Sequence, residues 1–251
     1  MQIDTIRDQL RLLRLPAAAS QLDDFLTTRK LKVDMTWLSE LLELELDARK
    51  ENTIERRIKK AAFPERRSLE QFSWEFNKKL DRKLIEELAT CKFIEKNEIA
   101  LLLGNTGTGK THIAISIGLI AASQGHSVFC TSVKRLCQRI RIAIEKNALD
   151  QLFKQILTSK LWILDDWGVV TMPRDVSEEV FDLFDRRKHN SAMLLTSNRD
   201  VEEWPQVFKD PILANAAIDR MFENAKILLF QGPSYRMKGR IVIPDIDNGK
   251  L

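Results

Sequence analysis

The sequence predicts an α/β protein with two parts, a nucleotide-binding domain built on a parallel sheet and a smaller all-helical domain before it. Residues 1–97 contain no glycine, and their apolar residues recur at helical spacing. From residue 98 onward, short apolar runs alternate with helical stretches, and the first run leads into a glycine-rich loop. We therefore expect a helical N-terminal domain over residues 1–75, a linker over 76–97 and the nucleotide-binding core over 98–251.

Composition limits the class of protein. The 251 residues include 40 Lys and Arg against 36 Asp and Glu, a net charge of +4, with 44% hydrophobic and 30% charged residues. These values are typical of globular proteins and exclude a mainly disordered chain. The longest nearly apolar run, from Ile113 to Ala122, has half of the roughly 20 residues that a membrane-spanning helix needs. Three cysteines without metal-ligand spacing fit reduced thiols, so we expect a cytoplasmic protein that does not bind membranes.

Three helices are expected in the N-terminal part. Apolar residues from Ile3 to Leu13 form one helical stripe, and Pro16 suits the first turn of a second helix. Thr36 can cap a long third helix that ends before Pro64. This helix changes from acidic to basic along its length; a basic end is commonly a solvated face, and it can also bind phosphates. Its candidate DNA-binding residues are Arg56, Arg57, Lys59 and Lys60. Because residues 1–75 contain no phosphate loop or acid pair that could serve a nucleotide site, we expect this domain to bind DNA or to organise subunits.

The second part has the alternation of strands and helices that is typical of a doubly wound α/β domain. Continuous apolar runs of about five residues predict strands that are buried on both faces of a parallel sheet. The expected strands are 99–103, 127–131, 161–164, 192–196 and 226–230. The expected helices between them are 110–123, 133–158, 177–189 and 212–222.

The strongest motif is a complete phosphate-binding loop between the first expected strand and its helix. Its glycines allow successive backbone N–H groups to face the phosphates of a nucleotide. Lys110 can reach the β and γ oxygens, and the Thr111 hydroxyl can bind Mg²⁺. The expected nucleotide-binding residues are Gly104, Asn105, Thr106, Gly107, Thr108, Gly109, Lys110 and Thr111.

Polar residues follow two of the later strands at their carboxyl ends. Asp165 ends an apolar run, which places it where it can hold Mg²⁺ together with Thr111. The adjacent Asp166 can polarise the attacking water, although paired acids after a strand are also a common turn signal. Asn198 follows the next strand and can orient the water or touch the γ-phosphate, with an ordinary Ser-Asn turn as the alternative.

Several cations are further candidates. Arg220 and Arg236 lie further along the chain, and an arginine supplied by a neighbouring subunit can accelerate phosphoryl transfer, although most lone arginines are solvated or paired. The helix after the second strand is basic, which fits either backbone phosphates of DNA or an ordinary solvated surface. Its candidate DNA-binding residues are Lys134, Arg135, Arg139 and Arg141.

The order of these motifs resembles the helicase-loader and initiator branch of the AAA+ ATPases. Within that branch, the chain closely resembles the IstB-like proteins, which are ATP-dependent helpers of insertion-sequence transposases. The resemblance covers nearly the whole sequence, including the leucine-rich, acidic stretch from Trp37 to Arg49 and the Ala61-Ala62-Phe63-Pro64 segment. It implies a P-loop AAA+ core that lacks the C-terminal helical lid of most AAA+ proteins.

The resemblance also implies roles for individual residues and for partners. Lys110 and Thr111 would bind ATP and Mg²⁺, Asp165 and Asp166 would serve the metal and the water, and Asn198 would be a first sensor. In that family Arg220 corresponds to a finger supplied in trans, and Arg236 to a second nucleotide-sensing arginine. The implied protein is an ATPase that forms a homo-oligomer with nucleotide sites shared between subunits, binds duplex DNA, and recruits a transposase.

Two other functions remain open at this level. A DnaC-like replicative helicase loader would share the fold and prefer single-stranded DNA; the version with an N-terminal zinc module is excluded, since only Cys91 precedes the core. An architectural DNA-binding protein would use ATP only to assemble, with little turnover. Retention of both Asp165 and Asp166 argues against that second alternative.

Overall fold

A computed structural model describes residues 2–28, 35–187 and 190–238. The chain divides into two compact units, residues 1–56 and residues 57–251. Within the described residues, no helix combines the length and the apolar character that a membrane-spanning segment needs.

The first unit consists of helices α1 (Gln2–Leu12) and α2 (Pro16–Thr28) and most of α3 (Thr36–Ala61). The three helices follow the sequence prediction, with proline at the first position of α2. Few side chains are buried in this unit, among them Ile6 and Leu13. Its helices therefore enclose only a small core.

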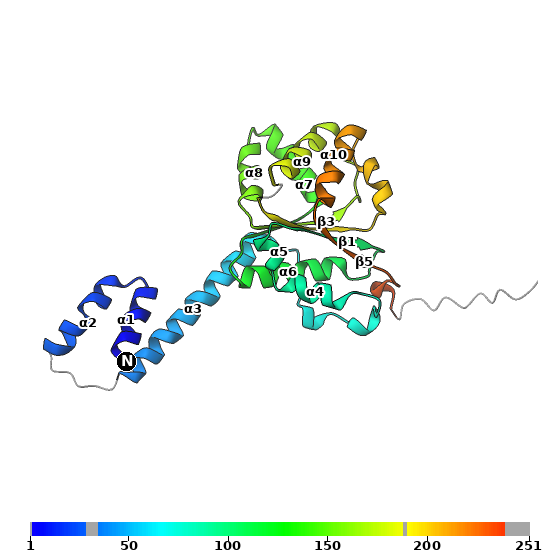
Figure 1. The fold of residues 1–251 in the computed structure, drawn as a ribbon. Helices are drawn as coiled ribbons and strands as arrows, with labels where there is room; N and C mark the ends of the chain where they lie inside the picture. Colours follow the sequence, from blue (N-terminus) through cyan, green and yellow to red (C-terminus); the bar gives the residue numbers. More distant parts are fainter. Residues whose placement is uncertain (1, 29–34, 188–189, 239–251) are drawn as a thin grey trace, which may run out of the picture. The chain divides into compact units, whose positions relative to one another are not determined.

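The second unit is built on a parallel sheet of five strands in the order β2-β3-β4-β1-β5 (Figure 1). The strands are β1 (Ile99–Gly104), β2 (Val128–Ser132), β3 (Leu161–Trp167), β4 (Ala192–Ser197) and β5 (Ala225–Phe230). Each of the five expected strands is present within three residues of its expected bounds. The prediction of a parallel sheet is confirmed, and all carboxyl ends of the strands lie at one edge.

Helices cover both faces of this sheet. One face packs against α7 to α10 through a core that includes Trp162 and Leu195, and the other packs against α4 to α6 through a core that includes Leu102 and Ile163 (Figure 1). The bounds are α4 (Arg82–Ala89), α5 (Lys92–Glu95), α6 (Lys110–Ser123), α7 (Val133–Glu145), α8 (Leu149–Leu157), α9 (Arg174–Arg187) and α10 (Pro211–Phe222). Short 3₁₀ helices are η1 (Leu69–Gln71), η2 (Trp74–Phe76), η3 (Val201–Val207) and η4 (Tyr235–Met237).

The single helix expected over 133–158 is two helices, α7 and α8. Asn147 has a left-handed backbone with φ of 50°, and the Ala148 N–H donates to the carbonyl of Ala143 (2.8 Å). This pairing is the usual left-handed termination of a helix, which asparagine tolerates better than most residues. Sequence periodicity alone did not reveal the break, because apolar residues continue at helical spacing across it.

The segment expected as a linker is packed and helical. Helix α4 buries Ile85 and Leu88, and α5 buries Phe93 and Ile94, all in the core beneath the sheet. The division between the units falls between residues 56 and 57, inside α3, rather than near residue 75. Residues 82–95 belong to the second unit because α4 and α5 are short amphipathic helices. Their apolar faces cover the same face of the sheet as α6. The sequence predicts no C-terminal lid. The structure describes this end of the chain to residue 238, so residues 239–251 lie outside the described part.

This boundary generates a truncation test. A chain that begins at residue 57 should stay folded and bind ATP, whereas one that begins at residue 76 should lose thermal stability and ATP affinity, because residues 57–75 pack onto α6 and the phosphate loop. Thermal melts and nucleotide titrations of both truncations measure this. Equal melting temperatures for the two truncations would contradict the packed boundary.

Candidate nucleotide-binding site

The phosphate loop connects β1 to α6 at the carboxyl edge of the sheet. Gly104 has φ of +135°, and a Cβ there would lie 2.1 Å from the carbonyl oxygen of Phe230. Gly109 has φ of +103°, and a Cβ there would lie 2.5 Å from the ring of Phe72. Both positions therefore need glycine for backbone conformation and for space. The structure gives the loop the strand-to-helix setting that the sequence predicted.

Two segments far away in the sequence clamp this loop. On one side the Tyr235 N–H donates to the Gly107 carbonyl (2.9 Å), and the Asn105 N–H donates to the Phe230 carbonyl (3.3 Å). On the other side His112 Nε2, in the first turn of α6, lies 2.8 Å from the carbonyl oxygen of Ser68. Ser68 is four residues before Phe72, whose ring contacts Gly109. The loop is thus held in shape before any nucleotide binds.

Lys110 lies inside the loop. Its Nζ donates to the carbonyls of Gly104 (2.7 Å) and Asn105 (2.6 Å), and the residue is only 5% exposed. Burial lowers the pKa of Lys110 to about 8, although the carboxylates of Asp165 and Asp166 oppose this shift. The ammonium is therefore poorly compensated, and phosphate oxygens are suitable partners for it.

Asp165 receives two hydroxyl hydrogen bonds. Thr111 Oγ1 donates to its Oδ1 (2.9 Å), and so does Thr196 Oγ1 (2.6 Å). Burial raises the pKa of the Asp165 carboxyl, and the hydrogen bonds from Thr196 and Thr111 oppose that rise. A hydroxyl and a carboxylate side by side at the end of the loop are oxygen ligands of the kind that Mg²⁺ prefers.

Magnesium would share these two residues with the phosphates of the nucleotide. Among the residues that the structure describes, no group of three or more His, Cys, Asp or Glu side chains is placed to hold a metal ion. Sites for Mg²⁺ in nucleotide-binding proteins commonly use one or two protein oxygens plus phosphate oxygens and water. Thr111 and Asp165 fit that pattern, and when bound the ion would neutralise charge on the β- and γ-phosphates.

Asp166 and Asn198 are brought together as the sequence suggested. Asn198 Nδ2 donates to Asp166 Oδ1 (3.3 Å), and the Asp166 N–H donates to Thr196 Oγ1 (3.0 Å). Asp166 has a left-handed backbone with φ of 60°, at a register shift between β3 and β4 after Leu164. Such a conformation costs about 1–3 kcal/mol outside glycine, and strained residues cluster at functional sites.

Arg220 is not brought to the phosphate loop of its own chain. It lies near the end of α10 and lines a cavity of about 280 Å³ with Glu98, Ile99 and Ser191, which mark the amino edge of the sheet. Its Nε forms an ion pair with Asp185 (2.7 Å). The phosphate loop follows the opposite, carboxyl edge, so the geometry leaves Arg220 able to serve only a nucleotide held elsewhere.

Arg236, by contrast, lies on the loop side. It belongs to η4, whose first residue donates its N–H to the loop at Gly107, and its charge contributes to the lowered pKa of Lys110. The Arg236 side chain is exposed. Arg236 is therefore on the side of the molecule from which a second cation could approach a nucleotide in the loop of the same chain.

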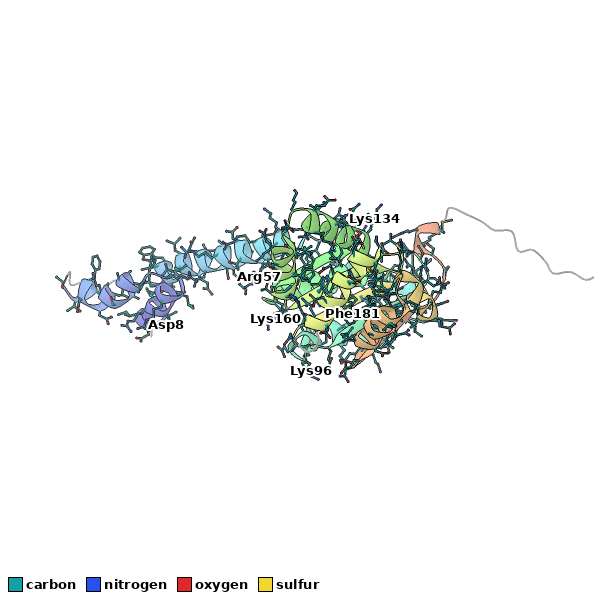
Figure 2. All side chains as sticks on the ribbon, turned by 90° about the horizontal axis from the view of Figure 1, so that it is seen from above. Asp8, Arg57, Lys96, Lys134, Lys160 and Phe181 are labelled. Carbon is teal, nitrogen blue, oxygen red and sulfur yellow. The ribbon has the colours of Figure 1, made fainter. Side chains whose placement is uncertain are left out.

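The basic residues of α7 divide into three environments. Lys134 and Arg141 are exposed (Figure 2 labels Lys134). Arg139 is half-buried: its guanidinium lies 5.1 Å from the centre of the Phe129 ring and donates to Gln155 (2.6 Å), and burial lowers its pKa. Arg135 is exposed and lines a cavity of about 220 Å³ together with both acids of the site. Arg139 thus serves α7–α8 packing, which the sequence did not show.

The basic end of α3 is more uniform. Arg56, Lys59 and Lys60 are exposed, whereas Arg57 is half-buried. The boundary between the two units separates Arg56 from the other three.

Sequence reasoning missed two residues of the site. Thr196, which joins Asp165 to β4, carried a usable signal, because it lies near the carboxyl end of β4, the strand that pairs with β3. No role was predicted for Phe72, because its contact with Gly109 joins positions 37 residues apart, and its segment was expected to lie outside the core.

This fold and this site define a P-loop ATPase core of the AAA+ class. The chain belongs to the family described as IstB-like ATP binding protein, whose model matches residues 5–242. It is 36% identical over 197 residues to the insertion sequence IS21 putative ATP-binding protein of Pseudomonas aeruginosa, covering 78% of this chain and 74% of that one. It is 32% identical over 237 residues to the insertion sequence IS232 putative ATP-binding protein of Bacillus thuringiensis subsp. berliner, covering 94% of each.

Solved structures agree on the fold. An AMPPCP-bound DnaA from Aquifex aeolicus matches 70% of this chain with a TM-score of 0.57 and 20% identity, and this chain spans about half (54%) of that one. DnaI matches 66% of this chain and 92% of its own length, with a TM-score of 0.57 and 18% identity. The predicted fold class and family are confirmed, and family membership supports the predicted ATPase activity.

The lowered pKa of Lys110 predicts a pH-dependent ATP affinity. The phosphates of bound ATP favour the charged ammonium, so the pKa of Lys110 in the complex lies above about 8, its value in the free protein. ATP affinity should be constant below about pH 8 and then fall by up to about tenfold per pH unit until the pKa of the complex is passed. Calorimetric titrations from pH 7 to 10 measure this. Lys110→Ala should bind ATP weakly at every pH, and wild-type affinity in that variant would contradict the assignment.

Asp166→Asn should separate binding from hydrolysis. The amide keeps an oxygen near Asn198 but loses the charge that orients the attacking water, so ATP still binds and turnover falls by about 10²-fold or more. Asp165→Asn is the matched comparison, because it should also weaken the Mg²⁺ dependence of ATP binding. Steady-state hydrolysis and nucleotide affinity are the measurements, and wild-type turnover in Asp166→Asn would remove Asp166 from the catalytic residues.

Proposed function

We propose that this chain is an ATP-dependent DNA-binding regulator of transposition that assembles on duplex DNA and recruits or stimulates a transposase. The observation that carries the proposal is the arrangement of Asp165, Asp166 and Asn198, in a chain of a family whose relatives are named for insertion sequences. A protein that used ATP only for assembly would have no need of an acid held in a strained conformation beside an amide.

Oligomeric assembly is part of the proposal. Arg220 lines the amino edge of the sheet, while the phosphate loop follows the carboxyl edge, so one chain does not combine them. A head-to-tail arrangement, in which one copy's amino edge meets the next copy's loop, would bring the two together. Such heterologous contacts repeat from copy to copy and build rings or helical filaments.

Duplex DNA is the proposed surface on which the oligomer forms. Lys134 and Arg141 are seven residues apart on α7, which places them on one face of the helix, and both are exposed. Contacts to backbone phosphates carry no sequence information, and they suit a protein that accepts many targets. Repeated along an oligomer, modest contacts from each copy would add up.

The trans role of Arg220 has a complementation test. Arg220→Ala and Lys110→Ala should each lose nearly all hydrolysis, and mixing them should restore part of it, because the first variant offers an intact loop and the second an intact finger. Removal of such an arginine costs about 10³-fold or more in turnover. Light scattering establishes whether mixed oligomers form. Mixed oligomers without restored hydrolysis would show that Arg220 does not act in trans.

The proposed DNA surface has a salt-dependence test, which also tests the function. Lys134→Ala/Arg141→Ala should weaken binding to unrelated duplexes equally and reduce the slope of log K against log salt by up to about 0.9 for each phosphate that is no longer neutralised. ATP turnover without DNA should not change. Arg174→Ala is the control, since Arg174 is an exposed arginine that pairs with Glu178 on α9.

Competition with single-stranded DNA distinguishes the main alternative. Tighter binding of single strands than of duplex, with ATP present, would favour a helicase loader instead. An unchanged salt slope in the double variant would leave the basic end of α3 as the DNA-binding surface.

A further inference from the structure

For its length, the N-terminal unit exposes more large apolar side chains than the ATPase unit. Among the described residues, seven of the fourteen exposed large hydrophobic side chains lie in residues 1–56, which are less than a quarter of the chain. Neither of the two hydrophobic core clusters contains a residue of this unit. Apolar surface concentrated in this way marks a site of interaction with another molecule.

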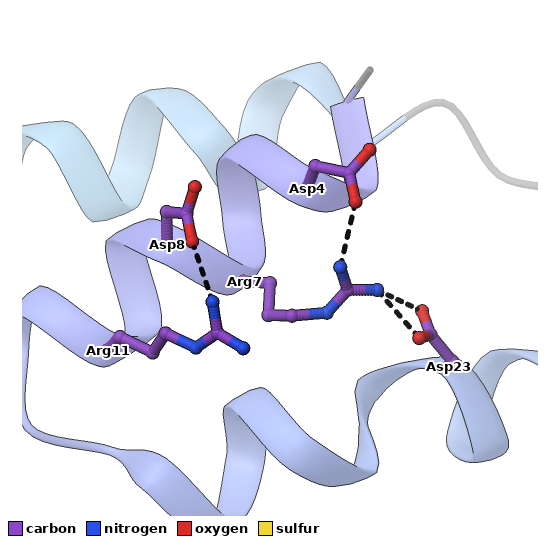
Figure 3. Close-up of polar contacts among 5 residues, drawn as sticks. All are labelled: Asp4, Arg7, Asp8, Arg11 and Asp23. Atoms are coloured by element: carbon purple, nitrogen blue, oxygen red, sulfur yellow. Dashed lines mark hydrogen bonds and ion pairs between the residues drawn. The ribbon is translucent and has the colours of Figure 1, made fainter.

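Polar contacts fix which side of α3 faces the other helices of the unit. Arg7 on α1 forms ion pairs with Asp4 (2.7 Å) and with Asp23 on α2 (2.6 Å), as Figure 3 shows. Gln9 Nε2 on α1 donates to the Ser39 carbonyl on α3 (3.1 Å), and the Ser39 hydroxyl donates back to Gln9 Oε1 (3.1 Å). Ser39 therefore marks the inner side of α3.

Three large apolar side chains lie on the other side of α3. Trp37, Leu41 and Leu44 are 59%, 55% and 69% exposed. Their spacing of four and three residues places them in one stripe, and at 100° per residue all three lie roughly 140–160° around the helix from Ser39. We call these three residues the α3 stripe. A tryptophan with two leucines at this spacing is typical of the anchors by which one helix binds another protein.

Acidic residues flank the α3 stripe. Glu40, Asp47 and Glu51 are exposed, lie about 80° or less from the stripe on one side, and make no ion pair with a described residue. The whole unit has eleven Asp and Glu against nine Lys and Arg. This charge disfavours DNA and anionic membranes as occupants. A second copy of the stripe is also disfavoured, because its acids would meet like charges.

We propose that the α3 stripe is a docking surface for a protein segment that carries apolar anchors flanked by lysine or arginine. The inference rests on the proposed function, in which that protein is the transposase. The apolar side chains would supply the binding free energy, and the acids would supply specificity and rate of association. It also assigns the two units different partners, protein for the N-terminal unit and DNA for the basic surfaces of the ATPase unit.

The test measures binding of the full-length protein to the purified transposase of the same insertion sequence, immobilised on a sensor, at several salt concentrations. Leu41→Ser/Leu44→Ser should weaken binding by roughly tenfold or more. Glu40→Lys/Asp47→Lys keeps the apolar stripe, and it should weaken binding and flatten its salt dependence. Leu12→Ser, which removes a leucine 71% exposed on α1, is the matched control and should change affinity by about twofold at most.

Helix content from circular dichroism and ATP turnover, both expected at wild-type levels, show that the variants are folded. Unchanged transposase binding in the two double variants would overturn the proposal, as would equal losses in Leu12→Ser. A smaller ATP-dependent oligomer in Leu41→Ser/Leu44→Ser would show that the stripe joins copies of this chain instead. If the wild type does not bind the transposase, the docking proposal fails, while duplex binding and ATP turnover of the same sample report separately on the proposed function.

Discussion

The carboxylate of Asp165 is the interaction on which the site depends, because it joins two strands of the sheet to the helix that follows the phosphate loop. Asp165 follows the four buried residues that open β3, accepts a hydrogen bond from Thr111 at the start of α6, and accepts another from Thr196 near the end of β4. Hydrogen bonds to a charged group contribute about 1.5–3 kcal/mol each. Since Thr196 also accepts the N–H of Asp166, the same hydrogen bonds fix the backbone from which the second acid projects toward Asn198.

The phosphate loop is held by two chain segments, one before the first strand of the sheet and one at the end of the last strand. Residues 68–72 pack against it from one side and residues 230–236 from the other. Between them Lys110 is held by carbonyl groups alone, which stabilise an ammonium less well than anionic oxygens do. No carboxylate of the described residues forms an ion pair with Lys110, so the loop holds a cation that is preorganised for phosphates. Residues 57–98, which precede β1, are therefore a structural part of the ATPase unit.

Local patterns in the sequence predicted the sheet and the convergence of polar residues at one of its edges, because buried parallel strands are continuous apolar runs and their carboxyl ends lie together. Asp165, Asp166 and Asn198 could be grouped for that reason. Contacts other than those among the polar residues at that edge of the sheet could not be predicted. Phe72 meets Gly109, and Arg139 is tied to Gln155 across a helix break that the periodicity concealed. The packed position of α4 and α5 was missed for a related reason: each is short, and its apolar side is explained only by tertiary packing, of α4 on α6 and of α5 on β4.

The two edges of the sheet carry different candidate site residues. At the carboxyl edge, Lys110, Thr111 and the two acids converge within a single copy, in an arrangement suited to the phosphates of a nucleotide. At the amino edge, Arg220 is held beside Asp185 and over the Phe181 ring, 4.6 Å from its centre. An arginine fixed there cannot turn through the sheet to its own loop. If Arg220 takes part in hydrolysis, a second copy must supply it, and turnover then depends on whatever surface gathers the copies together.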